Sequence, residues 1–388
     1  MYVSSPSLQT LLDTASRIVD AVVYPMAQEV DRNASWPEHS MRAFAEAGLT
    51  GLQVPMHLGG HGQGLLALAK MTEVIGRACP SSALCFGMHC VGTAVIAAKA
   101  TPQHEAAYLR PIAEGRHITT LALSESGTGA HFYLPETRLT KSGDGRHFSI
   151  SGTKQFVTNG GKADSYVVST LAASIEAEAG DFSCLIVDGT TLGLEWLTQW
   201  DGFGMRGNSS RGVTFNDAHV PATNLLGEDG DEVWYVFEVV APYFLMAMAG
   251  TYLGVAQSAL DATGAQLRDR KYSHSGSVLR EVEGLQTRYA EMWMAVEKTR
   301  ALVYEAARRG DAGEADALPF ILACKADAGD TAVHLANEAM TICGGTAYRD
   351  NSRVAQILRD ARASHVMSPT TDLLKLWTGR SLLGMSLL

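Results

Sequence analysis

The sequence predicts an α+β chain in three parts: an N-terminal α-helical domain over residues 1–116, a middle antiparallel β-barrel or β-sandwich domain over 117–228, and a C-terminal four-helix bundle over 229–388. Two observations lead to this prediction. Apolar residues recur at helical spacing in the first and last parts. In the middle part the pattern changes to short runs typical of strands, which glycine, aspartate and serine separate.

The first part has helical spacing from about residue 7 to residue 115. Leu65, Leu68, Ala69, Thr72 and Ile75, for example, recur three or four positions apart and so lie on one side of a helix. Proline interrupts this region at Pro25, Pro37, Pro55, Pro80 and Pro102. Because proline is poorly tolerated inside a helix, we expect several helices of moderate length.

The middle part contains six runs with the composition of strands, over residues 117–125, 148–158, 165–171, 182–187, 194–200 and 212–220. Their short length and the turn residues between them favour a small antiparallel barrel or sandwich.

The last part returns to long helical patterns, over residues 243–270, 278–309, 319–341 and 371–387. Short connections join them. Long helices with short links are typical of a helical bundle.

Composition narrows the class of protein. No apolar run reaches the roughly 18 residues of a membrane span, and the N-terminal segment lacks the pattern of a signal peptide, so we expect a soluble cytoplasmic protein. A net charge of −10 argues against a nucleic-acid-binding protein, because such proteins neutralise phosphates. The six cysteines and twelve histidines show neither C-x-x-C nor H-E-x-x-H spacing, so no metal site is expected.

Four segments together carry a resemblance to a known family. Residues 122–129, A-L-S-E-S-G-T-G, resemble the motif T-E-P-x-x-G-S-D, and residues 152–159, G-T-K-Q-F-V-T-N, resemble G-x-K-x-W-I-T-N. Residues 203–210, F-G-M-R-G-N-S-S, resemble the segment before V-F-x-D-x-x-V-P, which residues 213–221 resemble in turn. Cys-Gly-Gly at 343–345 and R-D-A-R at 359–362 resemble I-L-G-G…R-D-A-R. In order and spacing the chain resembles the acyl-CoA dehydrogenases over nearly its whole length.

The resemblance implies FAD as cofactor, held between the β domain and the C-terminal bundle. It places Leu123, Ser124 and Ala130 against the flavin ring, where a hydroxyl and backbone amides can hydrogen-bond the pyrimidine edge. Phe156 replaces the family's usual tryptophan and can still stack on the isoalloxazine face. Thr158 is expected to hydrogen-bond near N5, the atom that receives hydride.

Other matching residues point to a neighbouring subunit. Arg270 matches the family arginine that pairs with the FAD pyrophosphate of a neighbour, a role that suits a bidentate guanidinium. Thr341, Gly344 and Gly345 match the segment that reaches the adenine side of a neighbour's FAD. The resemblance therefore implies a homotetramer, or at least a homodimer.

The family's catalytic base is missing from its usual position. The family has I-Y-E-G-T where this chain has V-M-S-P-T over residues 366–370, so Ser368 occupies the position of the catalytic glutamate. Thr370 and Asp372 match residues beside the flavin, and Thr370 is also a good helix N-cap. Because a serine hydroxyl is a very poor proton acceptor, the chemistry at this position has changed.

Some family members carry the glutamate at a second position, and here that position is Phe244. Two further family residues differ as well: Leu245 replaces an arginine, and His131 replaces an aspartate. The backbone N–H of Ser368 can still polarise a thioester carbonyl. Either another group accepts the proton, with Glu125, His89, His131, His365 and a water held by Ser368 as candidates, or the reaction needs no strong base.

By this resemblance the chain is an FAD-dependent oxidoreductase acting on CH–CH donors, which desaturates an acyl thioester of CoA or of a carrier protein between its α and β carbons. An electron-transfer partner or oxygen would reoxidise the flavin. The alternative is a flavin-dependent monooxygenase or another non-dehydrogenase reaction on the same fold, since a hydroperoxyflavin mechanism does not need the missing glutamate. A protein that keeps FAD without catalysis is the third hypothesis.

Overall fold

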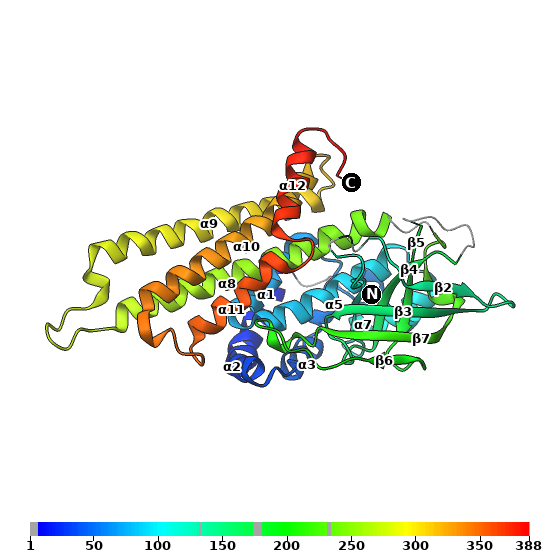
Figure 1. The fold of residues 1–388 in the computed structure, drawn as a ribbon, viewed down its shortest axis with the longest axis horizontal. Helices are drawn as coiled ribbons and strands as arrows, with labels where there is room; N and C mark the ends of the chain where they lie inside the picture. The colour runs from blue at the N-terminus through cyan, green and yellow to red at the C-terminus, as the bar shows by residue number, and fades with distance from the viewer. Residues whose placement is uncertain (1–6, 130, 132, 174–180, 231–233, 388) are drawn as a thin grey trace.

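In the computed structural model, residues 7–129, 131, 133–173, 181–230 and 234–387 are described. Long helices form one end of the molecule and two β-sheets form the other (Figure 1). The N-terminal helices lie where the long helices and the sheets meet, next to both of them. This arrangement agrees with the predicted order of helices, strands and helices.

The N-terminal region is helical, as predicted. Within its described residues the α-helices are α1 Leu8–Ile18, α2 Tyr24–Asn33, α3 Glu38–Glu46, α4 Leu65–Ala78, α5 Pro80–Ala98, α6 Pro102–His104 and α7 Arg110–Ala113. Helix α5 is buried along almost its entire length. It packs on β1 on one side and on α8 on the other, so it forms the centre of the molecule.

The β domain consists of two four-stranded sheets, in the orders β1-β4-β5-β8 and β2-β3-β7-β6. The strands are β1 Thr119–Ala122, β2 Arg138–Lys141, β3 His147–Val157, β4 Ser165–Leu171, β5 Phe182–Asp188, β6 Leu194–Trp196, β7 Arg211–Pro221 and β8 Leu225–Leu226. Apolar residues from both sheets share one core, including Ile150, Val168 and Phe215, as expected for a sandwich.

The sheets depart from the predicted pattern in two respects. Strands β1 and β4 pair in parallel, whereas all other pairs are antiparallel. The chain passes through β2 and β3 of the other sheet between these two strands, so β4 re-enters in the direction of β1. The short strands β2 and β8 were not predicted, because two to four residues give too little alternation to recognise.

The C-terminal region contains α8 Ala241–Asp269, α9 Glu283–Asp311, α10 Ala317–Cys343, α11 Arg353–Val366 and α12 Thr371–Leu382. The three long helices lie close to their predicted ranges. Helix α11 was not predicted as a helix and lies along α8, whereas α12 stands across the end of the bundle (Figure 1). Helix α10 contacts each of the other four.

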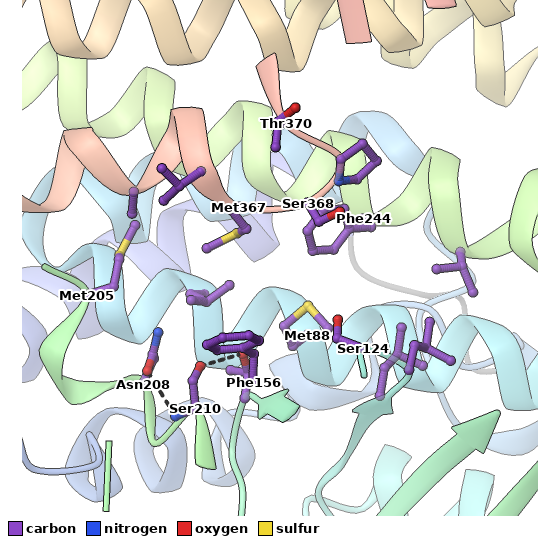
Figure 2. Close-up of a pocket in the computed structure, with 18 of the residues that line it drawn as sticks. Met88, Ser124, Phe156, Met205, Asn208, Ser210, Phe244, Met367, Ser368 and Thr370 are labelled. Atoms are coloured by element: carbon purple, nitrogen blue, oxygen red, sulfur yellow. Dashed lines mark hydrogen bonds between the residues drawn. The ribbon is translucent and has the colours of Figure 1, made fainter. Parts of the chain in front are cut away.

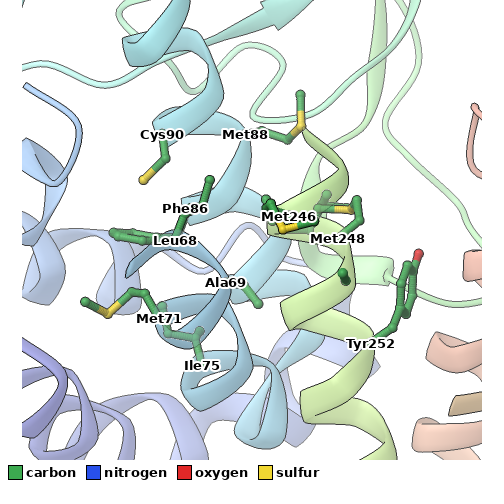
Figure 3. Packing of buried hydrophobic residues seen from close by; sticks show 14 of the residues in the cluster. Leu68, Ala69, Met71, Ile75, Phe86, Met88, Cys90, Met246, Met248 and Tyr252 are labelled. Atoms are coloured by element: carbon green, nitrogen blue, oxygen red, sulfur yellow. The ribbon is translucent and has the colours of Figure 1, made fainter. Parts of the chain in front are cut away.

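Helices α4 and α8 approach each other closely because glycine lies at their contact. A Cβ atom on Gly250 would lie 2.2 Å from the carbonyl oxygen of Ala69, and one on Gly254 would lie 2.5 Å from that of Glu73. Around this contact the apolar side chains of α4, α5 and α8 form a continuous core (Figure 3). The N-terminal helices and the bundle are therefore joined by close packing.

Two helical segments, Pro80–Ala98 and Tyr235–Asp269, are long and apolar enough to cross a membrane by length and composition alone. Within the protein, 89% and 83% of their most apolar windows are buried. Their composition is therefore explained by their place in the core.

The N-terminus of α4 is capped by a residue of the bundle. The Asp311 carboxylate accepts hydrogen bonds from the backbone N–H groups of Leu65 (2.6 Å) and Leu66 (3.0 Å). A negative charge at this end also interacts favourably with the helix dipole.

We predict that Asp311→Ala lowers the free energy of unfolding by about 1–2 kcal/mol, because it removes this cap. Asp316→Ala is the control, since Asp316 is exposed and bonds only to Arg309 among the described residues. We expect that substitution to change stability by less than about 0.5 kcal/mol. Urea unfolding measures both, and equal effects would contradict the capping role.

Candidate active site

A cavity of about 510 Å³ lies where the β domain, α5, the start of α8 and the turn between α11 and α12 meet. This volume is in the range of small-molecule and cofactor sites. Six of the residues predicted from sequence line it: Leu123, Ser124, Phe156, Thr158, Ser368 and Thr370. Figure 2 shows Ser124 and Phe156 on one side of the cavity and Ser368 and Thr370 on the other.

Phe156 forms part of the β-domain wall in an unusual backbone conformation. It lies at a bulge of β3, between Lys154 and Val157, and has φ of +55°. Bulky residues rarely adopt such values, so the surrounding structure must hold the backbone there. The ring is 64% exposed, lies edge-on to Trp200 and faces the cavity. An apolar ring presented in this way can cover a flat aromatic ligand.

The end of β3 is fixed by Asn159, the last residue of the segment 152–159. Its side chain donates to the carbonyl oxygen of Cys85 on α5 (2.9 Å) and accepts from Trp36 Nε1 (2.8 Å). The preceding residue, Thr158, lies 3.2 Å from the Ser210 hydroxyl, and both line the cavity. Through Asn159, the backbone next to Thr158 is therefore fixed to the N-terminal region.

Glu125 lines the cavity, but its carboxylate is fully engaged by other groups. Lys154 Nζ lies 2.5 Å from Oε1, and the Thr137 hydroxyl (2.8 Å) and the backbone N–H of Glu136 (2.8 Å) also donate to the carboxylate. Burial alone would raise the pKa of Glu125, but Lys154 and these donors lower it overall. Glu125 is thus a structural anion, with Lys154 fully buried behind it.

The three histidines proposed as bases lie outside the cavity lining. His89 is buried between Thr50 and Thr119, and burial lowers its pKa to about 4. His365 lies 3.1 Å from Asp330, and His131 is exposed. Among the described residues that line the cavity, no side chain presents an unpaired carboxylate or imidazole.

The opposite wall comes from the bundle. Ser368 and Thr370 lie in the turn between α11 and α12, and Phe244 lies at the start of α8 beside Ser368 (Figure 2). Thr370 is the N-cap of α12, as predicted, and its hydroxyl accepts from the backbone N–H of Leu373 (3.4 Å). Capping does not prevent Thr370 from lining the cavity.

A buried carboxylate positions a third part of the lining. Asp360 on α11 is 1% exposed and accepts a hydrogen bond from the backbone N–H of Met205 (2.7 Å), a residue of the lining. Burial, together with the nearby Asp31 charge, raises the pKa of Asp360 to about 7, although the bond from Met205 and two arginines oppose this. Asp360 belongs to the R-D-A-R segment at residues 359–362. Its hydrogen bond from Met205 therefore connects that segment to the lining of the cavity.

Of the remaining predicted residues, those that the structure describes do not line the cavity. Arg270, Thr341, Gly344 and Gly345 are exposed and lie at or next to the C-terminal ends of α8 and α10. Figure 1 shows that these two helix ends lie at the end of the bundle away from the β domain. Asp372 is exposed in the first turn of α12. Ala130 lies outside the described residues.

Several lining residues had no predicted role. They are Leu84 and Met88 on α5, Val240 and Ala241 near the start of α8, and Trp200, Met205, Asn208 and Ser210 in the segment before β7. The last four flank or belong to a segment that carries the family resemblance, so the signal was present in the sequence. The residues on α5 gave no signal, because a helix buried on all sides has no distinctive face.

The chemistry of the cavity fits a flavin. One wall presents an exposed aromatic ring, and hydroxyl groups of Ser124, Thr158 and Ser210 lie around it. A flat heterocycle with a polar edge needs this combination of an apolar face and hydrogen-bonding groups.

Comparisons with known proteins agree with this chemistry. Residues 5–116, 120–218 and 243–383 match the N-terminal, middle and C-terminal domains of acyl-CoA dehydrogenase. The chain is 30% identical to cyclohex-1-ene-1-carbonyl-CoA dehydrogenase of Geobacter metallireducens, over 96% of this chain and 97% of that protein. It is 28% identical to acryloyl-CoA reductase (NADH) of Anaerotignum propionicum, over 97% and 94% of the two chains.

Among solved structures, butyryl-CoA dehydrogenase of Megasphaera elsdenii superimposes with a TM-score of 0.90. The two proteins are 25% identical, and the match covers 99% of this chain and 100% of that one.

The raised pKa of Asp360 gives a prediction for stability. Between the unfolded pKa of about 4 and the folded value of about 7, the native state holds a proton that the unfolded state has released. Stability therefore falls as pH rises through this window, by up to about 4 kcal/mol.

We predict that Asp360→Asn removes this loss, so that the variant gains stability relative to the native protein between pH 4 and pH 7. Asparagine keeps an oxygen that can accept from Met205. Asp20→Asn, at an exposed position, is the control and should follow the native pH profile. Urea unfolding at a series of pH values measures the difference, and parallel profiles for all three proteins would rule the prediction out.

Proposed function

Because the chain belongs to the acyl-CoA dehydrogenase family, we propose that its reaction is the α,β-desaturation of an acyl thioester. It is an oxidoreductase acting on CH–CH donors, and its cofactor is FAD. The relatives described above are named as dehydrogenases and a reductase of CoA thioesters, which favours this reaction over the oxygen-dependent alternative.

One observation carries the proposal. Four segments that are far apart in the sequence meet around a single cavity: residues 122–129, 152–159 and 204–210, and the turn 366–370. Of these, the strained bulge at Phe156 is the most informative, because it exposes a large apolar ring that nothing in the fold itself requires.

The roles of the lining residues follow from their positions. We propose that Phe156 covers one face of the flavin, and that Ser124 and Thr158 hydrogen-bond its polar edge, with Leu123 in contact with the ring. Thr370 and Ala130 are proposed to lie beside the ring as well. FAD, when bound, would accept the hydride that leaves the β-carbon of the substrate, and with it the two electrons of the oxidation.

Ser368 is proposed to orient the thioester through its backbone N–H, which needs no carboxylate. The acyl group would lie against apolar side chains, because Leu84, Met88, Val240 and Phe244 line the same cavity. Of the candidate proton acceptors, Glu125 is ion-paired and the three histidines lie outside the lining. We therefore propose a water held by Ser368 as the proton acceptor.

The distant predicted residues are proposed to act on a second subunit. Arg270, Thr341, Gly344 and Gly345 are exposed at one end of the bundle, where a neighbouring chain can be reached. In a homotetramer or homodimer they would contact the pyrophosphate and adenine of that chain's FAD, and Asp372 would lie near the flavin. We further propose a cytoplasmic enzyme with a protein as electron acceptor.

The central test is anaerobic mixing of the purified FAD-bound protein with butyryl-CoA and with cyclohexane-1-carbonyl-CoA, both of which carry a hydrogen on the α-carbon. Desaturation predicts loss of the visible absorption of the oxidised flavin and formation of a new double bond in the thioester. Carrier-protein thioesters of the same acyl groups distinguish the two carriers. If no thioester bleaches the flavin without oxygen, desaturation of these substrates is wrong.

The position of Ser368 gives a second test. We predict that Ser368→Glu accelerates flavin reduction by a saturated acyl-CoA by about 10²–10⁴-fold, because it restores a carboxylate that can accept the α-proton. Ser368→Gln has a similar size and no proton-accepting carboxylate, so it should not accelerate the reaction. Stopped-flow absorbance measures both rates. Equal rates for the two variants would show that residue 368 does not face the α-carbon.

A further inference from the structure

A second buried lysine lies behind the turn that carries Ser368. Lys325 on α10 has no solvent exposure, and its Nζ donates to the backbone carbonyl oxygens of Ser364 (2.8 Å), Met367 (3.1 Å) and Pro369 (2.9 Å). All three acceptors lie within six consecutive residues. Among the described residues, no other side chain donates hydrogen bonds to three backbone carbonyl groups of the turn between α11 and α12.

The turn needs such a partner because it begins at a helix end. Helix α11 ends at Val366, so Ser364 lies in its last turn, where carbonyl groups lack intrahelical partners. Met367 and Pro369 then follow in the connection to α12, where no helical ladder satisfies their carbonyl groups. An ammonium group supplies three donors and also interacts favourably with the negative end of the helix dipole.

The same turn forms one wall of the cavity. Met367, Ser368, Pro369 and Thr370 line it, whereas Lys325 approaches the turn from within the bundle. No described carboxylate forms an ion pair with Lys325, in contrast to Lys154, which pairs with Glu125. Burial lowers the pKa of Lys325 to about 7, and the three carbonyl groups are the polar contacts that hold its Nζ.

We propose that Lys325 is a positioning residue, whose three hydrogen bonds hold the 364–370 turn and thereby place the Ser368 backbone N–H and Thr370 at the cavity. Lys325 acts from behind the turn and touches neither substrate nor cofactor. The catalytic part of this inference rests on the proposed function, whereas the ordering of the turn does not.

Lys325→Met and Lys325→Gln distinguish this role from simple space filling. Methionine fills a similar volume but donates no hydrogen bond, and glutamine keeps two N–H donors. Positioning predicts that the turn is most ordered in the native protein, less in Lys325→Gln and least in Lys325→Met. Space filling predicts the opposite order for the two variants, because replacing a buried charge by an apolar group is often stabilising.

Hydrogen exchange of the FAD-bound protein, read by mass spectrometry on peptides covering residues 364–374, measures this order directly. We expect exchange at least about 10-fold faster in Lys325→Met than in the native protein, with Lys325→Gln between them. Unchanged exchange in Lys325→Met, or slower exchange in that variant than in Lys325→Gln, would overturn the proposal. If Lys325→Met does not fold, the comparison of Lys325→Gln with the native protein decides by the same criterion.

Two controls separate local from general effects. Lys298→Met removes an exposed lysine on α9, and Leu335→Ala opens a cavity at a buried position farther along α10. Neither should change exchange in the 364–374 peptides, although Leu335→Ala lowers the melting temperature.

Flavin reduction by butyryl-CoA supplies the functional readout. We expect the limiting rate to fall at least about 10-fold in Lys325→Met, with little change in the apparent dissociation constant of the thioester, because Ser368 is misplaced while the apolar lining is kept. If butyryl-CoA fails to reduce the native enzyme, the proposed function fails for this substrate, and the exchange measurement still decides the role of Lys325.

Discussion

The close contact between α4 and α8 determines where the other parts of the site lie. At this contact the two backbones meet without intervening side chains, as the short distances from Gly250 and Gly254 require. Helix α5 is packed between these helices and β1, so Met88 faces the β domain opposite Phe244 of α8. Larger residues at the glycine positions would separate the helices and widen the cavity from this side.

The two walls of the cavity are each supported by a buried lysine, and the two lysines use different chemistry. Lys154 pairs with Glu125 and fixes the β-domain wall, where a carboxylate and several donors share one compact network. Lys325 supports the bundle wall by donating to carbonyl groups at a helix end. Cavity-lining residues stand in front of each lysine, so the walls are held by polar contacts that the solvent does not screen.

The sequence predicted those features that depend on local pattern. Strands β3 and β4, and helices α8 and α10, lie close to the expected ranges because their periodicity is long and regular. Six of the predicted site residues line one cavity. They could be predicted because their motifs resemble segments of one family. Helix α11 was missed because polar and charged residues occur around its whole circumference, and Met88 because α5 is apolar on every side. The roles proposed for Arg270 and Gly345 depend on a second chain, which one chain cannot supply.

The sequence by itself determined the order of the domains, the family and the substitution of serine for glutamate at position 368, because each is a property of consecutive residues. Only the tertiary structure decided which ionisable groups are available for chemistry. It placed Glu125 against Lys154 and His365 against Asp330, and it left Ser368 on the cavity wall beside Phe244. Whether a carboxylate or an imidazole can accept a proton depends on the groups that surround it, and those groups come from distant parts of the chain.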